Sequence, residues 1–245
     1  MRERPILFSA PMVRALLSGK KTQTRRIAKI DTALGREALF APRRNKKYAP
    51  TFLLPDAADL AIEHCPYGQP GDQLWVRETW RIGAWDDHGG FWLDYCDGPR
   101  KGRRECQDVG MADKLADQNL DDLKKRNIQP TLAGRYEWNP GASPLRWRPS
   151  IHMPRWASRI SLAITDVRVE LLQDISAEDA LSEGVAQLVH DNLPVQQCGE
   201  YDAIEADPVE LYQDLWDRLN GQGAWDANPW VWVVEFNHQR SGDGH

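Results

Sequence analysis

The sequence lacks the features that mark membrane-spanning and disulfide-stabilised proteins. Only four of its 245 residues are cysteine, and none of them forms a C-x-x-C pair. No apolar run reaches the roughly 18 residues that a transmembrane helix needs, and the apolar stretch near the N-terminus is too short for a secretory signal. We therefore expect a cytoplasmic protein with free thiols and no membrane partner.

Motifs for metal-dependent or P-loop chemistry are also lacking. There is no Gly-rich phosphate loop, no H-E-x-x-H motif and no defensible Ser-His-Asp order. A zinc site made by Cys65, Cys96, Cys106 and either His64 or His152 is conceivable, but these spacings match no zinc-finger pattern. We expect the protein to use neither a metal nor a cofactor.

The charge is distributed unevenly along the chain, whose net charge is −5. Residues 1–50 carry thirteen Lys and Arg against three acidic residues, a net charge of +10, so the remaining residues carry −15. A basic N-terminal region in an otherwise acidic chain indicates a local site for a polyanion. Attraction between the two regions within the fold is an equally good and compatible explanation.

Apolar periodicity and capping residues predict a mixture of short helices and strands. The helices are expected over residues 10–19, 112–126, 176–184 and 207–221, and the strands over residues 22–27, 74–80, 160–171 and 229–236. Within 160–171, the alternation of apolar residues changes phase near Thr165 and Asp166. The extra residue predicts a bulge or sharp bend, which is a device that curls a sheet into a barrel.

These elements predict an α+β fold: a small β-barrel with flanking helices, in one domain over residues 1–237. Two long insertions are expected at about 31–66 and 82–146, because the first is Pro-rich, basic and irregular and the second interrupts the strand pattern. Residues 186–207 are expected to form a further acidic loop, and residues 238–245 a disordered tail.

The motif "GKKTQTRR", residues 19–26, gathers cations and hydroxyls behind one glycine. A helix C-terminus favours cations, which would explain Lys20 or Lys21 alone but not the paired threonines. In a strand, Thr22, Thr24 and Arg26 would point to one side. Cations mixed with hydroxyls suit a phosphate or a polarised carbonyl group.

Crowding of like charges in this motif has a chemical consequence. Lys21 lies near Lys20, Arg25 and Arg26, so we expect its pKa to be lowered. A lysine that is neutral part of the time can accept a proton from a hydroxyl group. Thr24 is then a candidate nucleophile and Lys21 its activator.

Glu183 is the next candidate. It falls in the last turn of its expected helix, just before Gly184. The helix C-terminus is already negative, so a raised carboxyl pKa is expected there, which suits proton transfer near neutral pH. A solvated surface glutamate is the alternative interpretation.

The segment 146–159, "RWRPSIHMPRWASR", combines four arginines, two tryptophans and His152 with no acidic residue. Cations interleaved with flat rings are typical of sites for single-stranded nucleic acid. Trp147 and Trp156 would stack on a base while the arginines hold phosphates. Alternatively, the tryptophans lie in the core and the arginines pair with the acidic C-terminal region. The candidate binding residues here are Arg148, His152, Arg155 and Trp156.

Four of these segments together resemble the ASCH family, the activating-signal-cointegrator homology domains of the PUA-like superfamily. "GKKTQTRR" is similar to the family's G-x-K-T-x-T-x-R signature and "PGDQLWV" to its G-D-x-(apolar)-x-V strand. The long strand before "AEDALSEG" and the terminal "WVWVVEF" complete the order. The tryptophan-rich segments of the sequence are most similar to those of the larger ASCH-like proteins of bacteriophages and prophages.

The resemblance implies a PUA-like β-barrel that binds RNA or a nucleobase beside its helices. A small bacterial member hydrolyses the acetyl amide of N(4)-acetylcytidine, and its catalytic lysine, threonine and glutamate correspond to Lys21, Thr24 and Glu183. Other members are ribonucleases or RNA binders. We thus expect a metal-independent amidohydrolase acting on an acylated nucleobase, with RNA, single-stranded nucleic acid or a modified nucleoside as partner. Binding without catalysis and ribonuclease activity remain open alternatives. The substrate-binding candidates in the signature are Thr22, Arg25 and Arg26.

Overall fold

The computed structural model describes residues 1–31, 38–40, 51–53, 62–85, 90–96, 98–132, 134–185 and 207–239. The chain divides into two compact units. The first comprises Met1–Ile6, Pro11–Trp75 and Ile160–His245, and the second comprises Leu7–Ala10 and Val76–Arg159. The fold combines helices with antiparallel strands, so the expected α+β class is confirmed.

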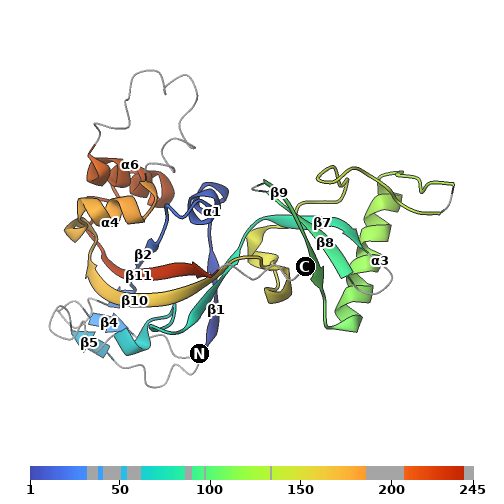
Figure 1. The fold of residues 1–245 in the computed structure, drawn as a ribbon. Helices are drawn as coiled ribbons and strands as arrows, with labels where there is room; N and C mark the ends of the chain where they lie inside the picture. The colour runs from blue at the N-terminus through green and yellow to red at the C-terminus, as the bar shows by residue number, and fades with distance from the viewer. Residues whose placement is uncertain are drawn as a thin grey trace, which may run out of the picture. The chain divides into compact units, whose positions relative to one another are not determined.

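A five-stranded sheet forms the centre of the first unit (Figure 1). Its strand order is β1-β6-β10-β11-β2. The strands are β1 (Glu3–Leu7), β2 (Gln23–Ile27), β6 (Gln73–Arg77), β10 (Ser161–Leu171) and β11 (Trp230–Gln239). Among the described residues no pairing joins β1 to β2, so the order is that of an open sheet.

The predicted bulge lies in β10. This strand pairs with β11 along its whole length, and the register shifts between Ile164 and Asp166. Ile164 and Val167 are both buried, while Thr165 and Asp166 between them are exposed. The extra residue therefore returns the apolar side chains to the interior after the phase change, as the sequence pattern predicts.

Three helices belong mainly to the first unit: α1 (Ala10–Leu17), α4 (Ala177–Ser182) and α6 (Pro208–Asn220). Ser176 caps α4 by accepting a hydrogen bond from the Asp179 N–H, and Asp207 caps α6 by accepting from the Val209 N–H. α4 and α6 lie over the β10–β11 pair (Figure 1). Their core contains Leu172, Ile175, Ala180, Val185, Tyr212, Leu215, Trp216, Trp225, Val231 and Val233.

The expected irregular insertion at 31–66 contains regular structure. Strands β3 (Ile30–Asp31), β4 (Ala38–Phe40) and β5 (Thr51–Leu53) form a small antiparallel sheet, followed by a 3₁₀ turn at Ile62–His64. β11 likewise continues to Gln239, so the first residues of the expected tail belong to a strand. The expected acidic loop lies outside the described residues except for Asp207, and the rest of the tail, residues 240–245, lies outside them too.

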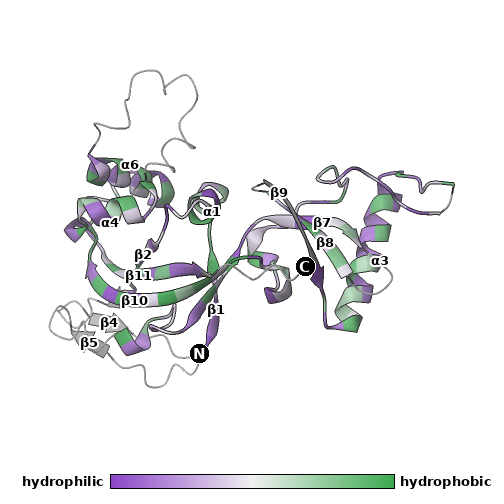
Figure 2. Cartoon of the chain, viewed as in Figure 1, coloured by the Kyte–Doolittle hydropathy of each residue, from purple (hydrophilic) through white to green (hydrophobic). Residues whose placement is uncertain are grey.

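The second unit has its own sheet and its own apolar core. Strands β7 (Trp80–Trp85), β8 (Gly90–Tyr95) and β9 (Gly98–Glu105) are followed by helix α3 (Val109–Lys125). Figure 2 shows α3 as a mixture of apolar and polar residues, as expected for a helix with one buried side. The core contains Trp80, Ile82, Phe91, Leu93, Tyr95, Cys106, Ala112, Leu123, Leu145, Met153 and Ala157.

One sequence expectation changes in this unit. The strand expected over 74–80 ends at Arg77, and a new strand begins at Trp80. The expected insertion over 82–146 lies wholly within this compact unit and supplies part of its core. Segment 150–157 forms two 3₁₀ turns, Ser150–His152 and Arg155–Ala157. In the part of the chain that the structure describes, every helix is too short or too polar to cross a membrane.

Candidate functional site

Lys21 and Glu183 meet in the interior of the first unit. The Lys21 ammonium donates to Glu183 Oε2 at 2.5 Å and to the Glu183 backbone carbonyl oxygen at 3.0 Å. The side chains are 0% and 5% exposed, respectively. The fold thus brings together an ammonium and a carboxyl group that are 162 positions apart in the sequence.

Backbone contacts between two helix ends hold this pair in place. After α1, Gly19 adopts a φ of +74°, and the N–H groups of Lys20 and Lys21 both donate to the carbonyl oxygen of Ala15. The Thr22 N–H then donates to the Ser182 carbonyl oxygen at 2.8 Å. The chain that follows α1 is therefore attached directly to the end of α4.

Gly184 permits the close approach of these segments. Its φ is +78°, a left-handed conformation that side chains disfavour. A Cβ atom at this position would lie 3.1 Å from the Ala15 Cβ and 3.2 Å from the Lys21 Cβ. The glycine after Glu183 is thus required both by backbone conformation and by space.

The pKa of Lys21 is lowered, mainly because burial penalises the charged ammonium. Glu183 opposes this shift through its charge and hydrogen bond, and Arg26 and Arg25 reinforce it. The expected direction is confirmed, but the leading cause is burial and not the like-charge crowding that the sequence suggested.

The buried Arg25 lies at the centre of an ionic network beside this pair. Its guanidinium contacts Glu170 at 2.6 Å and Asp179 at 3.1 Å, donates to the Gln23 side-chain oxygen at 2.5 Å and lies 3.7 Å from Glu183 Oε1. Because the Arg25 side chain is 0% exposed, these protein groups occupy the guanidinium that we expected to bind substrate.

Arg168 extends the network on the other side of the carboxylates. It pairs with Glu170 at 3.0 Å and Asp179 at 3.0 Å, and also with Glu235. Burial alone would raise the pKa of Asp179, but the Gln23 amide and the two guanidinium groups outweigh it and hold the pKa at about 2. We call Gln23, Arg25, Arg168, Glu170, Asp179 and Glu235 the ionic network.

Thr24 lies on the other side of β2 from this network. It is buried and pairs with Val234 across the sheet, while Gln23 and Arg25 on either side both reach Asp179. Side chains alternate along a strand, so the Thr24 hydroxyl faces away from Asp179. No hydrogen bond joins it to Lys21 or Glu183 among the described residues. The structure brings together two of the three predicted catalytic residues.

The remaining residues of the signature are placed by the same alternation. Arg26 pairs with Trp232 on the Thr24 side of the strand and is half-buried. Thr22, just before the strand, is exposed. Strand alternation therefore places the Arg26 side chain on the face of β2 opposite the ionic network.

In the second unit, the predicted nucleic-acid segment 146–159 divides into core and surface. The Trp156 ring lies 5.9 Å from that of Trp80 and 5.6 Å from that of Phe91, between centroids, so it packs against the core. Arg159 pairs with Glu78 at 2.9 and 2.7 Å, not with the acidic C-terminal region. Arg155 is exposed.

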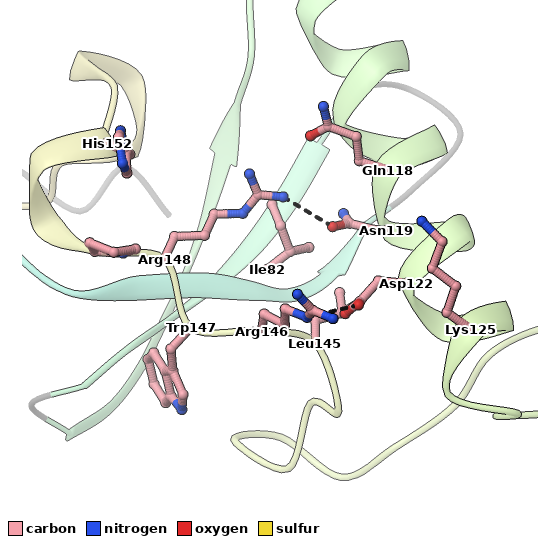
Figure 3. Close-up of a pocket in the computed structure, with 11 residues that line it drawn as sticks. Ile82, Gln118, Asn119, Asp122, Lys125, Leu145, Arg146, Trp147, Arg148 and His152 are labelled. Atoms are coloured by element: carbon pink, nitrogen blue, oxygen red, sulfur yellow. Dashed lines mark hydrogen bonds and ion pairs between the residues drawn. The ribbon is translucent and has the colours of Figure 1, made fainter.

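Arg148 and His152, by contrast, line a pocket of about 390 Å³. We call it the α3 pocket, because four residues of α3 form one of its walls (Figure 3). Segment 145–149 forms the facing wall. The sequence analysis predicted a helix here but assigned none of its residues to a binding site. Asn119, a polar residue between Ala112 and Leu123 on the buried side of that helix, was a signal in the sequence.

The described residues give no support to a zinc site. Within those ranges, no three His, Cys, Asp or Glu side chains are grouped so as to hold a metal ion. Cys65 and Cys106 are buried and Cys96 is exposed. Burial raises the pKa of the Cys65 thiol to about 11, which disfavours its thiolate at neutral pH.

No protein-family model, curated protein or solved structure matches the chain.

Proposed function

We propose that the chain is an ASCH-like protein whose first unit is a curled, PUA-like sheet and whose buried Lys21–Glu183 pair hydrolyses the amide of an acylated nucleobase such as N(4)-acetylcytidine. The 2.5 Å contact between these two groups is the observation that supports it. Buried ion pairs contribute little net stability, and ionisable groups with shifted pKa values gather at functional sites.

The chemistry uses the two oxygens of Glu183 differently. Oε2 is held by Lys21, whereas Oε1 has no hydrogen-bond partner among the described residues. We propose that Oε1 takes a proton from a water molecule as the water oxygen attacks the amide carbon. The C–N bond then breaks, the proton passes from Glu183 to the leaving nitrogen, and a carboxylic acid and an amine are formed. The Lys21 ammonium stabilises the developing oxyanion.

Water is the proposed nucleophile because of the position of Thr24. The resemblance implies attack by the Thr24 hydroxyl with Lys21 as base, but strand alternation directs that hydroxyl to the other face of β2. Thr24→Val removes the hydroxyl and nearly preserves the side-chain shape. It should abolish attack by Thr24 but leave attack by water unaffected.

The test is incubation with N(4)-acetylcytidine and chromatographic measurement of cytidine. We expect Lys21→Met and Glu183→Gln to lose activity by roughly 10²- to 10⁴-fold, the usual range for a general acid–base group. Lys20→Ala, on the exposed neighbour, is the matched control and should stay active. Absence of deacetylation by the wild-type protein would exclude this function. Loss of activity in Thr24→Val would restore the threonine route.

Binding without turnover is the second candidate, and the cationic α3 pocket favours it. Ribonuclease activity is distinguished from both by cleavage of labelled RNA in the presence of a chelator.

A further inference from the structure

The α3 pocket lies entirely within the second unit, between helix and loop. Gln118, Asn119, Asp122 and Lys125 extend from α3 on one side (Figure 3). Segment 145–149 faces them, and the buried side chains of Ile82 and Leu145 give the pocket apolar lining. A volume of about 390 Å³ is within the range that accommodates a small organic ligand.

The pocket has an excess of positive charge. Lys125, Arg146 and Arg148 line it, and among the described lining residues Asp122 alone is acidic. Asp122 is already paired with Arg146 at 3.1 Å and with Arg126 at 3.2 Å. The acid is therefore compensated by the protein itself, and the remaining cations are available to attract an anion.

Arg148 is held in a fixed position on the inner wall. Its backbone forms an antiparallel bridge with Trp80, and its guanidinium lies 5.5 Å from the centre of the Trp80 ring. One of its nitrogens donates to Asn119 Oδ1 at 3.3 Å (Figure 3). A guanidinium fixed in this way is preorganised for a ligand, because little side-chain freedom is lost on binding.

Asn119 supplies a donor that the protein leaves unused. The residue is 3% exposed, and a guanidinium only donates, so the atom facing Arg148 must be the amide oxygen. The Asn119 NH₂ group is left without a hydrogen-bond partner among the residues that the structure describes. A buried unpaired donor is costly, which indicates that a ligand or water acceptor completes it.

The Trp147 ring is not grouped with the Arg148 and Asn119 side chains. Figure 3 shows its ring directed away from Arg148 and Asn119. The guanidinium of Arg81 lies 4.4 Å from the centre of the Trp147 ring and covers one of its faces. Stacking of a base on Trp147 between the arginines, as the sequence suggested, is therefore not favoured by this arrangement.

We propose that the α3 pocket is a second binding site, separate from the Lys21–Glu183 pair, for a nucleotide-sized ligand held through its phosphate group. Arg148 and Lys125 bind the phosphate oxygens, and the Asn119 NH₂ donates to a further acceptor of the ligand. A free nucleotide and a nucleotide within a single strand present the same chemistry. The proposal does not depend on the hydrolase function.

The test is fluorescence anisotropy of a labelled ten-nucleotide single strand with the full chain at low salt. The matched variants are Lys125→Glu in the pocket and Lys124→Glu beside it on α3, because both positions are exposed and both variants change the net charge equally. We expect Lys125→Glu to weaken binding by at least tenfold and Lys124→Glu by less than twofold. Equal effects, or no binding by the wild-type protein, would overturn the proposal.

The buried donor has its own test. Asn119→Asp replaces the NH₂ group by a carboxylate oxygen that repels phosphate, and we expect tenfold weaker binding. Gln118→Ala, at an exposed position of the same wall, should weaken binding by a few fold without affecting folding. Unchanged binding in both variants would contradict the proposal that the α3 wall of the pocket contacts the ligand.

Competition with unlabelled nucleoside monophosphate identifies the source of the ligand. Release of the strand by the nucleotide, with the same sensitivity to Lys125→Glu, assigns a mononucleotide site. Strand binding that resists the nucleotide assigns a single-strand site.

Discussion

Two clusters of cations, one in each unit, have opposite environments. In the first unit, Lys21 and Arg25 are fully buried and bind carboxylates of the protein. In the second, Lys125 and Arg146 are exposed, and Arg148 is half-buried beside a pocket. Both clusters come from basic stretches of sequence that suggest anion binding. Only the burial and the partners of each side chain show which cations are occupied by the protein.

The two clusters should therefore differ in their contributions to folding stability and to ligand binding. Removing a cation from the first cluster takes a fully buried partner away from its carboxylates, so it should reduce the free energy of unfolding. Removing a cation from the second cluster leaves no buried charge without a partner, so it should reduce ligand binding only.

The largest expected effect is that of Arg25→Met. Glu170 and Asp179 lose their buried partner but keep Arg168, and we expect a loss of about 3 kcal/mol in the free energy of unfolding. Arg146→Met in the α3 pocket should change it by no more than about 0.5 kcal/mol. Urea denaturation of both variants gives the comparison. Similar losses would mean that the two clusters do not differ as described.

A smaller effect is expected from Gly184→Ala. The new Cβ has to adopt a left-handed φ and would crowd Ala15 and Lys21, so we expect a loss of about 2 kcal/mol. Gly141→Ala is the control, because Gly141 has a φ of +79° but open space around it. It should cost only about 1 kcal/mol. Equal losses in thermal or urea unfolding would show that the contact with Lys21 costs nothing.

The smallest expected effect concerns acid stability. The pKa of Asp179 is about 2 in the folded protein, below its ordinary value of 3.8. A depressed carboxyl pKa stabilises the fold fully above pH 4, and this contribution is lost as the pH falls from about 4 towards 2. Melting temperatures between pH 5 and pH 2 should therefore fall less steeply for Asp179→Asn than for the wild type. Asp113→Asn, exposed on α3, should keep the wild-type slope.

Local patterns predicted the helices and the β10 bulge well. Capping by Ser176 and Asp207, and the phase change at Thr165, depend on neighbouring residues only, so they are visible in the sequence. β9 was not predicted, because "GPRKGRRE" is basic and glycine-containing with no apolar alternation. Its strand conformation accompanies pairing with β8, a tertiary effect that outweighs local preference.

The candidate sites were predictable only in part. The pairing of Lys21 with Glu183 was expected from the resemblance, and the two groups are in contact. The position of Thr24 was implied by the strand pattern, since Lys21 lies out of phase with Thr22 and Thr24. The sequence alone could not show whether Trp156 packs in the core or stacks on a base, because its neighbours Trp80 and Phe91 are brought to it by the fold.

Hydrolysis of N(4)-acetylcytidine by wild type, Lys21→Met, Glu183→Gln and the double variant tests the account most directly. If the buried pair acts as one catalytic unit, the double variant should be no slower than the slower single variant, because the second substitution has nothing left to remove. Losses that multiply in the double variant would show that the two residues act independently, and a wild-type protein that forms no cytidine would contradict the catalytic role of the pair.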